Sequence, residues 1–192
     1  MKGKLLLAVI ALSMVSCVPA LASGANGRYL LSTNIPDWAT LATINCEFQG
    51  ALDCHWSIAA GVKYNPFKYF CGATSQTHLR QVTPSAGVRY WFGGAFDGWY
   101  AGVSLLAGEY SVSLPKSDMF FEGFLYGSSV CGGYLLPVSD RFALAFGAGV
   151  ALAHHNTTFY QGPVCGRRKG GSSGIAVFPS DIVLSLVLNL GR

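Results

Sequence analysis

The segment HWSIAAGVKY, residues 55–64, places an apolar residue at every second position. Its two faces are Trp56, Ile58, Ala60, Val62 and Tyr64 on one side, and His55, Ser57, Gly61 and Lys63 on the other. A period of two is typical of a β-strand, because successive side chains point to opposite faces of a sheet. A helix would scatter the same residues around its surface. The segment therefore predicts a strand with one apolar face.

The same alternation recurs along the chain. It is clear in 82–92 and 181–190, and weaker in 41–51, 99–107, 124–136 and 142–152. Arg28 to Ile35 supplies one more strand, which is needed if the chain is to enter and leave the sheet at the same end. Nine to eleven residues also suit a tilted strand that crosses a membrane, which needs about 9–11. The sequence predicts eight strands in total.

The predicted connections alternate in length. Short turns rich in Gly, Pro and Asp fall at 52–54, 93–98 and 137–140, and a first loop falls at Pro36-Asp37-Trp38. Long polar loops fall at 66–79, 111–121 and 154–174. Short periplasmic turns and long outer loops are typical of outer-membrane proteins. We therefore predict an all-β fold, an eight-stranded antiparallel up-and-down transmembrane β-barrel.

The composition favours a sheet whose outer face lies in lipid. The chain is 51% hydrophobic and 11% charged, whereas soluble domains carry about 25% charged residues. A soluble, ligand-carrying barrel shows the same alternation, but the weaker face of the strand from Phe142 is too apolar for water (Ala143, Ala145, Gly147, Gly149 and Ala151). Aromatic residues gather at predicted periplasmic strand ends, as an interfacial girdle does: Trp56, Tyr90, Phe92, Trp99, Tyr134 and Phe142. An exported soluble ligand-binding β-barrel is therefore kept only as a third hypothesis, after a non-enzymatic membrane barrel and a lipid-modifying barrel enzyme.

The first residues predict export. Lys2 and Lys4 precede an apolar run over 5–16, and Ala20-Leu21-Ala22 is a small-x-small cleavage pattern. We expect a signal peptide over 1–22, cleavage between Ala22 and Ser23, and a barrel domain over 23–192. Lipoprotein processing at Cys17 is the alternative. The expected location is the cell outer membrane.

An ordered set of short motifs adds a family resemblance. The set is Glu47-Phe48, His55-Trp56-Ser57, Tyr64-Asn65-Pro66-Phe67, Pro84, Arg89-Tyr90-Trp91, residues 98–102, residues 122–127, Gly133-Tyr134 and Gly147-Ala148-Gly149. In these motifs the chain resembles a domain-of-unknown-function family of small outer-membrane β-barrel proteins common in Bacteroidota. Members often lie near fimbria-like gene clusters, so the resemblance implies a link to fimbria-like assembly. It carries over no catalytic residue, and the end of the chain, Leu190-Gly191-Arg192, lacks the usual terminal aromatic.

Four charged residues fall on the predicted inward face of the strands: Glu47, Lys63, Arg89 and Asp181. Charges at membrane depth are candidates for a proton or ion path. An eight-stranded barrel is barely wide enough for its own side chains, and an unpaired charge there is costly. We therefore interpret the four residues as a charge network that fills the lumen.

Cysteine and histidine positions predict one crosslink and no metal. Cys71 and Cys165 both lie in predicted outer loops and face an oxidising compartment, so we expect a disulfide between them. Metal binding by His78, His154, His155 and these cysteines lacks a recognisable ligand spacing. No cofactor is expected.

These patterns favour a non-enzymatic outer-membrane protein with a structural or surface-interaction role. The expected partners are outer-membrane lipid and lipopolysaccharide, which Arg167-Arg168-Lys169 would contact through phosphates, and surface or fimbria-like proteins. The formal charge of +4 is too small to indicate nucleic-acid binding. The alternative is a lipid-modifying barrel enzyme with His154 or His155 as base to a serine on a neighbouring strand, although no nucleophile motif is present.

Overall fold

The computed structural model describes residues 28–39, 42–66, 68–70, 76–113, 119–161 and 167–191. Its elements are β1 (Tyr29–Asn34), α2 (Ile35–Ala39), β2 (Ile44–Ala51), β3 (Trp56–Asn65), β4 (Lys68–Phe70), β5 (Gln76–Trp91), β6 (Gly98–Ser113), β7 (Met119–Pro137), β8 (Phe142–Gln161) and β9 (Arg167–Asn189). Within these residues, no helix has both the length and the apolar character needed to cross a membrane.

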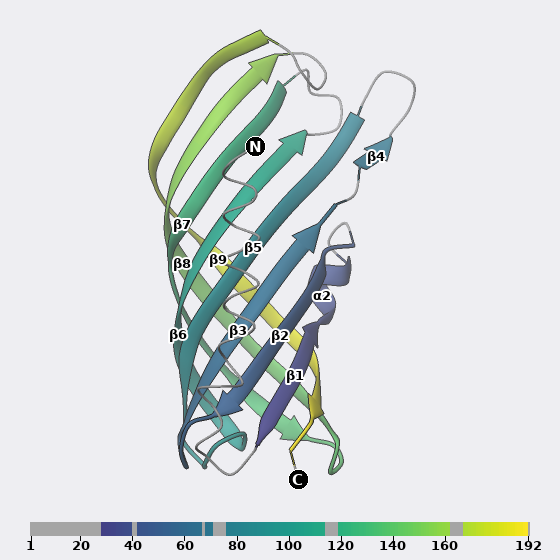
Figure 1. Cartoon of the computed structure of the whole chain (residues 1–192), viewed down its shortest axis with the longest axis vertical. Helices are drawn as coiled ribbons and strands as arrows, with labels where there is room; N and C mark the ends of the chain where they lie inside the picture. Colours follow the sequence, from purple (N-terminus) through teal and green to yellow (C-terminus); the bar gives the residue numbers. More distant parts are fainter. Residues whose placement is uncertain are drawn as a thin grey trace.

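The sheet closes on itself. Each long strand runs antiparallel to the next, β3 pairs directly with β5, and β1 pairs with β9. Eight strands therefore form a ring in up-and-down order, while β4 only extends the free edge of β5 (Figure 1). The predicted all-β fold with eight antiparallel up-and-down strands is confirmed.

The three predicted long loops were wrong over most of their described residues. Residues 76–79, 111–113, 119–121, 154–161 and 167–174 all belong to paired strands. Backbone hydrogen bonds continue through these polar and glycine-rich stretches, because strand pairing needs no apolar face. Alternation of apolar residues ends earlier than the strands do, so the pattern marked only part of each strand.

The predicted first loop was also wrong, because residues 35–39 form the helix α2. Pro36 is tolerated there, since an N–H in the first turn has no partner within the helix. The helix ends where the Ala42 and Thr43 N–H groups donate to the Trp38 and Asp37 carbonyls, at 3.1 and 3.0 Å. β2 then begins at Ile44, later than the predicted Leu41.

The ring is closed over only part of its height. β1 has six residues, and it pairs with β9 only from Leu30–Asn189 to Asn34–Ser185. Figure 1 shows β5–β9 rising well beyond the end of β1, where α2 lies. Among the described residues, 167–184 of β9 therefore pair with β8 alone. We call the junction of β1, α2 and β9 the seam.

Side chains cap the seam where strand pairing stops. The Asn34 side-chain amide donates to the Ile182 carbonyl at 3.1 Å, and its oxygen accepts from the Leu184 N–H at 3.0 Å. The Lys63 ammonium donates to the Ser180 carbonyl at 3.5 Å, and Pro179 has no N–H to satisfy. These contacts satisfy backbone groups that would otherwise form an open strand edge.

The two faces of the ring differ as strand alternation requires. Large apolar side chains are exposed on its outside, including Val103, Leu105, Val130, Phe146, Val150, Val177, Ile182, Leu184 and Leu186. Inward positions carry small or polar side chains, such as the buried Ser57, Ala59, Ser129, Ala145, Ala151 and Ser185. The outer surface is therefore the apolar one.

The end of the ring that carries the short turns is filled by an aromatic cluster. Trp91 is 1% exposed and packs on Phe96 and Tyr100, with ring centroids 5.4 and 5.0 Å away. Its indole N–H donates to the Ser57 hydroxyl at 2.9 Å. The turn over residues 93–97 is drawn inward by a 2.6 Å bond from the Ala95 N–H to the Cys54 carbonyl. The interior is therefore closed at this end.

The turn before β3 is organised by one carboxylate. Asp53 Oδ1 accepts hydrogen bonds from the His55 and Trp56 N–H groups, at 2.7 and 2.8 Å. These bonds favour the charged form and so lower the pKa of the Asp53 carboxyl. The turn predicted from Leu52-Asp53-Cys54 thus acquires its stabilising side chain from its central residue.

We expect Gly127→Val to disturb the pairing of β7 with β8. A Cβ at Gly127 would collide with the Leu152 carbonyl oxygen and the Ala153 backbone. Overpacking of this kind costs about 1–3 kcal/mol, so thermal unfolding followed by circular dichroism should begin at a lower temperature. Ser128→Val, on the exposed face of the same strand, is the control. Equal losses in the two variants would contradict this reading.

Candidate functional site

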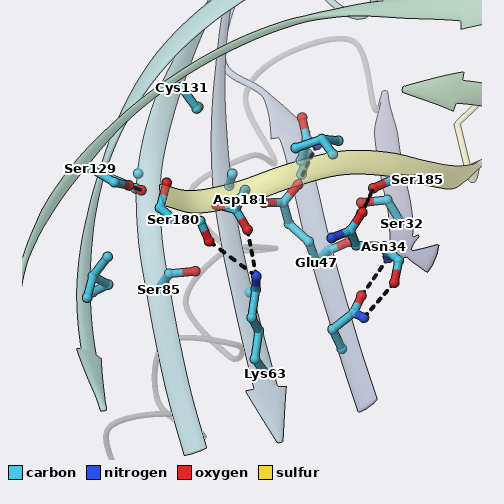
Figure 2. A pocket seen from close by; sticks show the side chains of 18 of the residues that line it. Ser32, Asn34, Glu47, Lys63, Ser85, Ser129, Cys131, Ser180, Asp181 and Ser185 are labelled. Atoms are coloured by element: carbon cyan, nitrogen blue, oxygen red, sulfur yellow. Dashed lines mark hydrogen bonds and ion pairs between the residues drawn. The ribbon is translucent and has the colours of Figure 1, made fainter. Parts of the chain in front are cut away.

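A cavity of about 320 Å³ lies inside the ring, above Trp91 and Tyr100. Its walls combine hydroxyl and amide side chains with apolar residues and with five charged residues: Asp37, Glu47, Lys63, Arg89 and Asp181. Leu106, Leu125 and Phe178 add apolar wall. The cavity is therefore amphipathic. Figure 2 shows two of its charged side chains, Lys63 and Asp181, in contact with each other.

Glu47 on β2 and Arg89 on β5 form a two-pronged ion pair. Arg89 Nη1 and Nη2 donate to Glu47 Oε1 and Oε2, at 2.8 and 2.7 Å. The strand between them, β3, presents Gly61 opposite Glu47 and Ser57 opposite Arg89. These small side chains let the ion pair reach across β3. Bidentate Arg–carboxylate pairs are among the strongest polar contacts in proteins.

Two more groups orient this pair. The Gln49 side-chain N–H₂ donates to Glu47 Oε1 at 2.8 Å. The Arg89 guanidinium carbon lies 5.2 Å from the centre of the Tyr100 ring, in cation–π range. The pair is thus held between an amide and the aromatic cluster that closes the ring.

Lys63 forms a second centre with two carboxylates. Its Nζ lies 2.6 Å from Asp181 Oδ1 on β9 and 3.1 Å from Asp37 Oδ2 on α2. Ser180 is an extra residue in β9, because Gly149 pairs with Asp181 while Val150 pairs with Pro179. Such a bulge re-aims side chains, and both Ser180 and Asp181 line the cavity (Figure 2).

The structure brings the four predicted charges together as two separate pairs, Glu47 with Arg89 and Lys63 with Asp181. Asp37 was missed, because its segment was predicted to be an outer loop. The inward role of Tyr100 was not predicted, because the prediction for this strand used only its outward-facing Trp99. The alternation itself placed Tyr100 on the inward side with Gly102 and Ser104, so that signal was present.

The predicted cleavage site, the alternative lipoprotein cysteine and the predicted disulfide all fall on residues that the structure does not describe. These residues are Cys17, Ala22, Ser23, Cys71 and Cys165. Cys46, Cys54 and Cys131 are free thiols. In the described part of the chain, no three His, Cys, Asp or Glu residues are grouped as metal ligands.

The two candidate histidines lie on β8, away from the cavity lining. His154 Nε2 lies 3.3 Å from the Ser173 hydroxyl on β9, and its ring contacts Tyr126 at a centroid distance of 5.3 Å. Nδ1 of His154 and Nδ1 of His155 are buried, and neither has a hydrogen-bond partner within the described ranges. A third group that would orient His154 is thus absent from its described surroundings.

These features define a class: an all-β protein whose eight antiparallel strands close around a charged, polar cavity. The chain belongs to the family described as "Protein of unknown function (DUF3575)", whose family model matches residues 7–190. The expected membership of a domain-of-unknown-function family is confirmed. No curated protein and no solved structure matches the chain.

We expect Glu47 and Arg89 to be energetically coupled. Glu47→Gln or Arg89→Met alone leaves a charge in the cavity without its partner, which costs about 3 kcal/mol of unfolding free energy. The double variant should lose less than the sum of the single losses. Denaturant unfolding of the three variants measures this coupling. Strictly additive losses would show that the contact contributes nothing.

Proposed function

We propose that the chain is an outer-membrane β-barrel that is exported by a signal peptide over residues 1–22, which is removed during export. Its role is structural or in surface interaction, and it is not an enzyme. The observation that carries this proposal is the belt of exposed apolar side chains around a ring whose inside is polar. The bacterial distribution and fimbria-like context that the family resemblance implied belong to the same proposal.

The exposed apolar belt is unfavourable on a surface that faces water. Leu105, Val177 and Ile182 are each 69% exposed, and Ile175 is 72% exposed. Soluble monomers rarely expose large contiguous apolar patches, whereas a membrane barrel needs an apolar outside and a polar inside. Near the short turns the exposed residues become aromatic: Trp56, Phe92, Trp99 and Phe142. Aromatic rings prefer the boundary between hydrocarbon and water, so these turns fit the periplasmic boundary.

The opposite end supports a role at the surface. Beyond the belt, β5–β9 continue as paired strands with polar outward residues, including Glu122, Asn156 and Ser173. β9 begins with the exposed Arg167, Arg168 and Lys169. Basic side chains bind phosphate readily, so lipopolysaccharide phosphates are fitting partners. The projecting sheet also offers a surface for surface or fimbria-like proteins.

The interior supports a filled barrel better than a pore. Trp91, Phe96 and Tyr100 close the end with the short turns, and the charged residues of the cavity wall form ion pairs, with Lys63 shared between Asp37 and Asp181. A conducting path needs an opening at both ends. We therefore assign the ion pairs a structural role in filling the barrel.

Residues 185 and 186 of β9 test the orientation in lipid. Leu186 is 44% exposed on the outside, while Ser185 is 6% exposed and lines the cavity. We expect Leu186→Arg to hinder insertion, because a cation that faces lipid is unfavourable, by about 2–4 kcal/mol at the midplane and by less toward the interfaces. Ser185→Asn should insert almost normally. Membrane fractionation and heat-modifiable gel mobility measure insertion. Normal insertion of Leu186→Arg, with failure of Ser185→Asn, would invert the face assignment.

One observation favours the alternative of a lipid-modifying enzyme. A serine hydroxyl within reach of a histidine nitrogen is the start of a nucleophilic site, and Ser173 and His154 lie 3.3 Å apart on the outward side of β8 and β9. The unpartnered Nδ1 of His154 argues against it, because catalytic histidines are oriented by a third group.

A fluorophosphonate probe distinguishes the two functions. Under the main proposal, the purified chain in detergent is not labelled, and Ser173→Ala changes nothing. Labelling that is lost in both Ser173→Ala and His154→Gln, but kept in Ser172→Ala, would establish the enzyme instead. Ser172 is the matched control, since it neighbours Ser173 but faces the other side of the strand.

A further inference from the structure

We propose that the cavity binds a small organic cation, namely an amine with several N–H donors. The proposal depends on the outer-membrane function only for the side from which the amine enters. Binding itself follows from the charges and unpaired acceptors of the cavity wall.

The charged groups of the wall do not balance. Asp37, Glu47 and Asp181 contribute three carboxylates, whereas Lys63 and Arg89 contribute two cations. Lys63 is shared between Asp37 and Asp181, so one negative charge has only part of a partner. The surplus negative charge attracts a cation to this part of the cavity. A ligand cation beside Asp37 and Asp181 would complete the neutralisation.

An unpaired acceptor points to the same ligand chemistry independently. Gln49 is 4% exposed and lines the cavity, yet its Oε1 has no hydrogen-bond donor among the described residues. The orientation of this amide is determined by Glu47, because a carboxylate accepts only from the N–H₂ group. In the described part of the chain, the Ser180 hydroxyl is also buried without a partner. A buried acceptor left unpaired costs about 1–3 kcal/mol, which a ligand N–H would recover.

Other ligand classes fit less well. An anion would meet a net negative wall, since both cations are already engaged. A divalent metal needs converging ligands, and the described residues hold no group of three suitable side chains. Leu106, Leu125 and Phe178 in the wall suit a short hydrocarbon skeleton. The volume of about 320 Å³ lies at the small end of ligand pockets, which span roughly 300–1,000 Å³.

The ligand has one described route of access. The aromatic cluster of Trp91, Phe96 and Tyr100 closes the end with the short turns. The cavity wall reaches Asn34, Asp37 and Asp181 at the seam, where the ring gives way to α2. Entry therefore occurs from the seam side, which in the proposed orientation faces the cell exterior.

Isothermal titration calorimetry of the folded full-length protein in detergent tests the proposal, with 1,4-diaminobutane as the probe. The neutral analogue 1,4-butanediol is the matched ligand control, because it keeps the carbon skeleton and lacks the charge. We expect saturable heat with the diamine and none with the diol. Binding of both, or of neither, would overturn the proposal.

Two variants move the wall charge in opposite directions. Asp37→Asn removes the surplus negative charge and should weaken diamine binding about tenfold or more. Lys63→Met removes the cation that Asp37 and Asp181 share, which leaves both carboxylates unpaired, and should tighten diamine binding. Asp53→Asn, in the turn at the closed end, should leave affinity unchanged. Should Lys63→Met fail to fold by circular dichroism, Ser180→Ala replaces it, with weaker binding expected. Unchanged affinity in Asp37→Asn would overturn the proposal.

The outcomes separate this inference from the proposed function. A protein that inserts into membranes but ignores the diamine leaves the outer-membrane function intact and ends the amine site. A protein that binds the diamine yet fractionates as soluble keeps the amine site and ends the membrane proposal.

Discussion

Closure of the backbone hydrogen-bond ladder is the constraint on which the rest of this structure depends. β3 pairs with β5 and β1 pairs with β9, so eight strands satisfy one another around a ring. Where β1 ends, that closure stops, and the chain replaces strand pairing by the Asn34 amide and the Lys63 ammonium. The residues that finish the wall are therefore also residues of the cavity.

A narrow ring places strict limits on its inward side chains. Gly61, Ala59 and Ser57 leave room over β3 for the Glu47–Arg89 pair. The aromatic cluster fills the end with the short turns, and the charged residues occupy the part above it. The cavity that remains is lined in part by the polar side chains at inward positions. Its wall carries a net negative charge because α2 contributes the additional carboxylate of Asp37.

Much of the fold could be predicted from alternation and strand parity. The period of two identified seven strands of the ring and the inward face that holds Glu47, Lys63, Arg89 and Asp181, and the need to enter and leave the sheet at the same end added the first strand. It failed beyond the apolar belt, where β8 and β9 continue through polar and glycine-rich residues. Strand pairing there depends on backbone bonds, which leave no periodic signal in the side chains.

The sequence by itself determined the number of strands in the ring, through alternation and the requirement that the chain enter and leave the sheet at the same end. It also determined the side of each strand that faces inward and the residue types available there, because side-chain alternation is a local property of the backbone. Only the tertiary structure decided which charges meet. The pairing of Glu47 with Arg89 depends on register across β3, that of Lys63 with Asp181 on a bulge in β9, and the contact with Asp37 on a helix where a loop was predicted. Register, bulges and helix placement depend on residues far apart in the chain, so no local pattern records them.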